Sequence, residues 1–242
     1  MAAWFFTEEE IRSEKYIITG ENAKHIKVLR MKRGEALTLV TPSGVQHDCE
    51  LVCFDNDTAE VEIKNSAPCR NEPDVFVTLY QALPKGEKMD YIVQKCVELG
   101  ISRIVPVISA RCVSRPDKKS LEKKQKRWQK IALQAAMQSR RGIIPEVSGC
   151  VSFEQAAKLS EDNEKNLFFY ELGGQPVKEI LTEKPKTIGM FIGSEGGFEE
   201  SEAELAASFG ANRATLGRRI LRAETAPLAA LSIIMYQTDN FS

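Results

Sequence analysis

The sequence GSEGGF at residues 193–198 directly follows the apolar run Ile188–Ile192, which is typical of a buried β-strand. A second glycine-bearing stretch, LGRRILRAETA at residues 216–226, follows a shorter strand candidate, Ala214–Leu216. Open α/β sheets bind ligands at the edge where the carboxyl ends of their strands lie. The two loops therefore predict one ligand pocket that is built mainly from backbone.

Strand and helix patterns alternate along the chain from Val75 onward, which predicts a mainly parallel sheet flanked by helices. Further strands are expected at Val75–Leu79, Arg103–Val107 and Asn166–Tyr170, with Pro106 favouring an edge strand or a bulge in the second. Helices are expected at Met89–Val97, Ser120–Ser139 with Ser120 as N-cap, Glu199–Phe209 and Pro227–Tyr236. The last helix is apolar on most sides, so it is either fully buried or half of a dimer interface.

The first 67 residues carry short β-like segments separated by polar turns, which predicts a small barrel. These segments are Tyr16–Ile18, Ala36–Val40, Gln46–Phe54 and Ala59–Lys64, with a helix candidate at Asn22–Leu29. A linker is predicted at Ala67–Asp74. The sequence thus predicts an α/β protein with a small domain at residues 1–70 and a larger one at 74–242.

Charge is strongly segregated, although the formal net charge is only -1. Eleven Lys/Arg and two Asp/Glu lie between Arg111 and Arg141, and five Lys/Arg with no acid lie between Lys24 and Arg33. Lysine runs of this kind usually form a solvated helix face. Arg140 and Arg141, beyond the predicted helix, are better candidates for phosphate contacts, as are Lys27, Arg30 and Lys32.

Several functional classes are disfavoured by composition. Only two histidines, His25 and His47, are present, which argues against histidine-rich metal sites, and no metal is expected. No P-loop motif occurs. The first residues lack the pattern of a signal peptide, and no apolar run approaches the ~20 residues that span a bilayer, so no membrane association and a cytoplasmic location are expected.

Each glycine loop allows a purely structural interpretation. The glycines at 193–197 could serve only to form a tight turn. Arg222 and Glu224 could form a structural ion pair, or they could place a cation and a carboxylate at a pocket.

The two loops together strongly resemble those of the RsmE family, bacterial uridine-N3 methyltransferases of small-subunit ribosomal RNA in the SPOUT (trefoil-knot) superfamily. The resemblance extends over the chain through HIKVLR at 25–30, QALPKG at 81–86, QKCVELG at 94–100 and QSRR at 138–141. Two positions depart from the family pattern: Ser194, where proline is usual, and Met137, where an acidic residue is frequent.

The resemblance implies a PUA-like N-terminal domain, a knotted C-terminal domain that binds S-adenosylmethionine, and a homodimer with the cofactor site near the interface. Its substrate would be 16S rRNA, within the small ribosomal subunit. Cofactor contacts are expected from Gly193, Glu195, Gly196, Leu216, Gly217, Ile220, Leu221 and Arg222. RNA contacts are expected from His25, Lys27, Arg30, Lys32, Arg140 and Arg141, with His25 in a packing or hydrogen-bonding role.

Methylation of uracil N3 requires loss of its proton, which suggests roles for three side chains. Arg222 is expected to stabilise the negative charge on the uracil oxygens. Glu195 or Glu224 is expected to accept the proton, with bulk water as the third option.

Three other classes remain open from the sequence. The chain could be a non-catalytic RNA-binding protein with a knot fold, or a ribose 2′-O methyltransferase of the same superfamily. It could also bind a nucleotide or sugar phosphate with the 193–198 loop as an anion site, although the acidic helix start after that loop disfavours anions.

Overall fold

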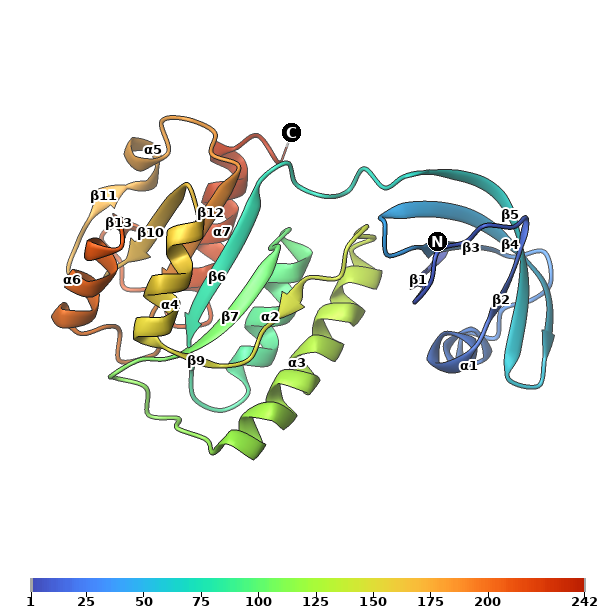
Figure 1. Ribbon diagram of the computed structural model, residues 1–242, viewed down its shortest axis with the longest axis horizontal. Helices are drawn as coiled ribbons and strands as arrows, with labels where there is room; N and C mark the ends of the chain where they lie inside the picture. Colours follow the sequence, from blue (N-terminus) through green and yellow to red (C-terminus); the bar gives the residue numbers. More distant parts are fainter. Residues whose placement is uncertain (1, 242) are drawn as a thin grey trace. The chain divides into compact units, whose positions relative to one another are not determined.

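The computed structural model in Figure 1 describes residues 2–241 and divides into two compact units. The first unit contains the chain as far as Glu72 together with Ala136–Ile144. The second contains Pro73–Ala135 and the chain from Pro145 onward. The prediction counted Ala136–Ile144 in the domain at residues 74–242, whereas the contacts in the structure group these residues with the first unit. The predicted domain bounds stay a prediction.

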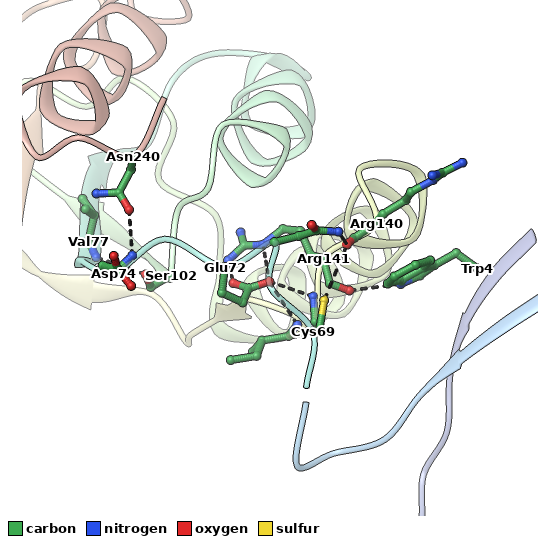
Figure 2. Close-up of polar contacts among 12 residues, drawn as sticks. Trp4, Cys69, Glu72, Asp74, Val77, Ser102, Arg140, Arg141 and Asn240 are labelled. Atoms are coloured by element: carbon green, nitrogen blue, oxygen red, sulfur yellow. Dashed lines mark hydrogen bonds and ion pairs between the residues drawn. The ribbon is translucent and has the colours of Figure 1, made fainter. Parts of the chain in front are cut away.

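Contacts of Glu72 attach Ala136–Ile144 to the first unit (Figure 2). The Glu72 carboxylate lies 2.5 Å from an Arg141 guanidinium nitrogen, and it accepts hydrogen bonds from the backbone N–H groups of Gly142, at 2.8 Å, and Ile143, at 3.2 Å. Trp4 donates its indole N–H to the Arg141 carbonyl at 3.0 Å. Since these partners lie about 70 residues or more apart in sequence, only the folded structure brings them together.

The first unit is built on a five-stranded sheet in the order β1-β3-β4-β5-β2. Only the β1–β3 pair is parallel. Its strands are β1 (Ala3–Phe6), β2 (Lys15–Ile18), β3 (Ala36–Val40), β4 (Val45–Asp55) and β5 (Thr58–Pro68), and α1 (Gly20–Val28) packs on β5. Phe5, Leu39 and Val61 are fully buried, so the core lies between the sheet and this helix.

The second unit contains a parallel sheet in the order β11-β13-β10-β12-β6-β7-β8, with β9 also pairing with β7. Its strands are β6 (Phe76–Ala82), β7 (Arg103–Ile108), β8 (Glu146–Val147), β9 (Val151–Ser152), β10 (Lys165–Phe169), β11 (Gln175–Pro176), β12 (Thr187–Ile192) and β13 (Ala211–Thr215). The strands β6, β10 and β12 are almost continuously buried, as expected for a parallel sheet covered on both faces.

Helices cover this sheet, with α4 in front of it and α2 behind it in Figure 1. The helices are α2 (Lys88–Glu98), α3 (Lys118–Gln138), α4 (Phe153–Leu159), α5 (Val177–Ile180), α6 (Glu200–Ser208) and α7 (Ala226–Gln237), with a short 3-10 helix, η1 (Ser160–Asp162). The helix α2 packs against α7, and α4 packs against α6. Within residues 2–241, no helix is both long and apolar enough to cross a membrane.

The predicted α/β architecture is confirmed, and several local details differ: β13 starts at Ala211 rather than Ala214, and the helix α4 was not predicted. Ser120 is not the N-cap of α3, because the helix starts at Lys118 and the Asp117 carboxylate accepts the Ser120 N–H at 2.8 Å. Pro106 lies in β7, the strand next to the edge of the sheet. On that side, β8 pairs with residues before Pro106 and β9 with residues after it, so the missing N–H of the proline is tolerated. The trefoil knot implied by the resemblance stays a prediction.

Candidate active site

A cavity lies at the carboxyl ends of the neighbouring strands β13, β10 and β12, and the start of α2, which follows β6, is also in its wall. Its volume is about 620 Å³, within the usual range for small-molecule sites. Both glycine loops line this cavity, as the sequence predicted. The strands β12 and β13 are not adjacent, however, because β10 lies between them. The last residue of β10, Phe169, and the two residues that follow it, Tyr170 and Glu171, also lie in the wall.

The 193–198 loop is a tight turn as well as a cavity wall. The Gly197 N–H donates to the Ser194 carbonyl at 3.0 Å, and Gly197 has a φ of +66°, which favours glycine. At Gly193, an added Cβ would lie 3.0 Å from the Gly197 Cα, so this position requires close backbone approach. Phe198 anchors the loop, since it is 1% exposed and its ring centroid lies 4.6 Å from that of Phe168. These glycines therefore form the tight turn, while their contact with a ligand stays a prediction.

All eight residues predicted to contact the cofactor line this cavity, namely Gly193, Glu195, Gly196, Leu216, Gly217, Ile220, Leu221 and Arg222. Ser194 also lines it, and its hydroxyl is buried without a hydrogen-bond partner among the described residues. Met137, the other departure from the family pattern, is buried and lies outside the cavity lining.

Arg222 and Glu224 do not form the ion pair that the sequence allowed. Arg222 is exposed and lines the cavity. The Glu224 carboxylate instead forms an ion pair with Lys88 at 2.9 Å. The same Lys88 ammonium lies 3.0 Å from the carboxylate of Glu195.

Lys88 is the functional candidate that the sequence analysis missed. It is the first residue of α2 and lies in the cavity wall. The sequence held one signal: a lysine at the amino end of a predicted helix, where the positive end of the helix dipole disfavours a cation. Nothing in the local sequence indicated that two distant glutamates share its ammonium.

The charges around Lys88 shift all three pKa values. Hydrogen bonds to Glu224, which has the larger effect, and to Glu195 raise the pKa of Lys88. The Lys88 ammonium, with the Glu224 backbone N–H, lowers the pKa of Glu224. Burial by itself would raise the pKa of Glu195, but hydrogen bonds from Lys88 and from the backbone N–H groups of Glu195 and Lys85 lower it overall. Both glutamates are therefore carboxylates at neutral pH.

The RNA-contact candidates lie in different environments. Lys27, Arg30 and Lys32 are exposed, as is Arg140, which has a φ of +57°. His25 is half-buried, with its ring edge-on to Phe5 at 5.5 Å.

Arg141 does not fit the predicted phosphate contact. Only 4% of its side chain is exposed, and its guanidinium is paired with Glu72 (Figure 2). Its charge is therefore used within the first unit, where it attaches residues 136–144.

Comparison with known proteins gives the family. Residues 71–235 match the model for an RNA methyltransferase domain, and residues 18–64 match that for an RNA methyltransferase PUA domain. The Bacillus subtilis (strain 168) ribosomal RNA small subunit methyltransferase E is 36% identical over 96% of this chain and 94% of its own length. This chain belongs to the ribosomal RNA small subunit methyltransferase E family.

Further members of the methyltransferase E family are similar over their full length. The Aquifex aeolicus (strain VF5) protein is 31% identical over 95% of this chain and 98% of its own. The crystal structure of the Neisseria gonorrhoeae enzyme, bound to S-adenosyl methionine, is 32% identical and has a TM-score of 0.89, covering 98% of each chain. The PUA-like and methyltransferase assignments of the two domains are therefore confirmed.

Proposed function

We propose that this chain transfers a methyl group from S-adenosylmethionine to N3 of a uridine in the 16S rRNA of the small ribosomal subunit. The main support is the cavity between the two glycine loops. Arg222 and Glu195 line this cavity, and Lys88 holds Glu224 beside it. The names of the relatives support the rRNA substrate, and the gonococcal relative binds S-adenosyl methionine.

The residues around the cavity fit an adenosine-bearing ligand. The cavity is lined by backbone at Gly193, Gly196 and Gly217 and by the apolar side chains of Leu216 and Leu221. The unpartnered hydroxyl of Ser194 lies in the same wall. A buried polar group without a partner is costly, so a hydrogen bond from a bound ligand would satisfy it.

The proposed chemistry assigns each charged group a step. S-adenosylmethionine, when bound, supplies an electrophilic methyl group on a sulfonium. A carboxylate of Glu195 or Glu224 accepts the proton of uracil N3, and the lone pair left on N3 forms the new N–C bond as the C–S bond breaks. Arg222 stabilises the negative charge that develops on the uracil oxygens. The loops supply orientation, which converts a bimolecular encounter into an oriented one.

The exposed basic residues of the first unit support RNA contact. Lys27, Arg30, Lys32 and Arg140 form its candidate phosphate-binding set, and His25 of α1 packs edge-on against Phe5. Since N3 is normally base-paired, the target base would be single-stranded or splayed out of its helix. We place this reaction in the cytoplasm, where ribosomal subunits are assembled.

A homodimer is part of this proposal, and the supporting feature is the exposed side of α7. Ile233 and Tyr236 are 39% and 74% exposed, whereas Leu231 and Ile234 on the other side of the helix are fully buried. Tyr91, on the adjacent helix α2, is 48% exposed. These apolar side chains would be covered by a second copy of the chain.

Nucleoside mass spectrometry of 16S rRNA tests the function directly. A strain without the protein should lack 3-methyluridine in its small-subunit rRNA, and complementation with the wild-type gene should restore it. The ribose 2′-O alternative predicts loss of a ribose-methylated nucleoside instead. Unchanged nucleosides together with retained RNA binding would favour the non-catalytic alternative.

A further inference from the structure

Lys88 joins three separate segments of the chain at one edge of the cavity. It begins α2, while Glu195 belongs to the loop after β12 and Glu224 to the loop after β13. The ammonium lies 3.0 Å from Glu195 and 2.9 Å from Glu224. One cation is thus the shared partner of both candidate proton acceptors.

The segment before α2 also donates a hydrogen bond to the Glu195 carboxylate. The backbone N–H of Lys85 lies 3.2 Å from each oxygen of that carboxylate. Gly86, with a φ of +65°, then turns the chain so that Lys88 reaches the same side chain. The Glu195 carboxylate is therefore fixed from two directions by residues 85–88.

Partial burial strengthens this cluster beyond an ordinary surface ion pair. The side chains of Lys88, Glu195 and Glu224 are 31%, 27% and 24% exposed. Exposed pairs contribute little because water and salt screen them, and that screening weakens as burial increases. The charge of Arg222 also lowers the pKa of Glu224.

The position of Lys88 is unfavourable for its helix. A cation at the first helical residue faces the positive end of the helix dipole. Helix stability therefore gives no reason for a lysine here, whereas the two carboxylates do.

We propose that Lys88 is a positioning residue for methyl transfer, which holds the Glu195 carboxylate in the cavity wall and the Glu224 carboxylate beside the cavity, and keeps both of them ionised. This inference rests on the proposed function, because it concerns the carboxylates that accept the N3 proton there. Lys88 does not accept the proton itself, since its two carboxylate partners hold it in the charged form.

The first test is the pH dependence of kcat/KM for methylation of small subunits from a strain that lacks the protein. Without the ammonium, the acid limb of the Lys88→Met profile should move to higher pH by about one unit, because an opposite charge at this distance lowers a carboxyl pKa by that order. The Lys88→Arg variant should keep the wild-type limb. Lys95→Met is the matched control, because Lys95 lies on the same helix, has a 35% exposed side chain and pairs with Glu98 away from the cavity.

The second test uses no ligand and measures thermal unfolding against pH. A carboxyl group whose pKa is lowered in the folded state stabilises that state at pH values above its ordinary pKa. This contribution is lost as the pH falls through the lowered pKa of the folded state. The difference in Tm between wild type and Lys88→Met should therefore be present at neutral pH and shrink below about pH 4.3, the ordinary pKa of glutamate. If Lys88→Met does not fold, Lys88→Gln serves in both tests.

The outcomes separate the two proposals. An unmoved acid limb in Lys88→Met, or a Tm difference that does not shrink on acidification, would overturn the role of Lys88. A wild-type protein that forms no 3-methyluridine would overturn the proposed function alone, and the ligand-free Tm series would still decide whether Lys88 keeps the carboxylates ionised.

Discussion

At the scale of single residues, two neighbours in one loop have different tasks. Arg222 reaches the cavity, while Glu224, two residues later, is held at Lys88. Their separation follows from the loop conformation, in which the Arg222 carbonyl accepts the N–H groups of Thr225 and Ala226, both at 2.9 Å, at the start of α7. This turn leaves the guanidinium free of Glu224 and available to a substrate.

Replacing Arg222 with alanine should therefore impair chemistry more than cofactor binding. Loss of one charge-stabilising donor typically lowers the rate by about 100-fold or more. Single-turnover methyl transfer should show this decrease in Arg222→Ala, while calorimetry should show a much smaller change in the Kd for S-adenosylmethionine. Arg222→Lys, which keeps the charge, is the control and should retain more activity. Full turnover in Arg222→Ala would show that the charge-stabilising role is wrong.

At the scale of elements, the sequence predicted most long strands and helices to within two residues. The helix α2 was predictable because its apolar residues repeat at helical spacing and Gly100, with a φ of +95°, follows its end. The two-residue strands β8, β9 and β11 were not, since they carry no periodicity and exist only through pairing.

The sequence predicted part of the cavity lining, but not Lys88 and not the arrangement of the lining. Both glycine loops were found because glycine and charge stand out beside apolar runs. The insertion of β10 between β12 and β13 depends on chain topology, and the Lys88 cluster depends on packing between α2 and two later loops. Neither is encoded in spacing along the sequence.

At the scale of elements, one prediction concerns how closely the segment Ala136–Ile144 packs on the first unit. An alanine Cβ at Gly142 would lie 2.7 Å from the Cβ of Cys69, so the backbone would have to move. We expect Gly142→Ala to cost about 1–3 kcal/mol of stability, as overpacking usually does. Gly149→Ala is the control, because a Cβ there meets nothing within 4 Å. Urea unfolding measures both, and equal midpoints for the two variants would contradict the close approach to Cys69.

At the scale of the whole molecule, the exposed side of α7 predicts the oligomeric state. An aspartate at Ile233 would place a charge in the proposed interface, so Ile233→Asp should convert the dimer to a monomer. Light scattering coupled to size-exclusion chromatography gives the mass. Leu159→Asp is the matched control, because Leu159 is 38% exposed and Ile233 is 39% exposed. Leu159 lies on α4 and not on α7, so this variant should leave the dimer intact. A dimer that survives Ile233→Asp would place the interface elsewhere.

The attachment of residues 136–144 to the first unit also sets an order of events during synthesis on the ribosome. When Glu72 leaves the exit tunnel, the Arg141 carbonyl that receives the Trp4 indole N–H has not yet been made. The strands β6 and β7 and the helix α2, all parts of the other unit, lie between Glu72 and Ala136 in the sequence and are translated before the segment 136–144. Although amino-terminal domains generally fold first in a nascent chain, this one is completed only once Ile144 has emerged.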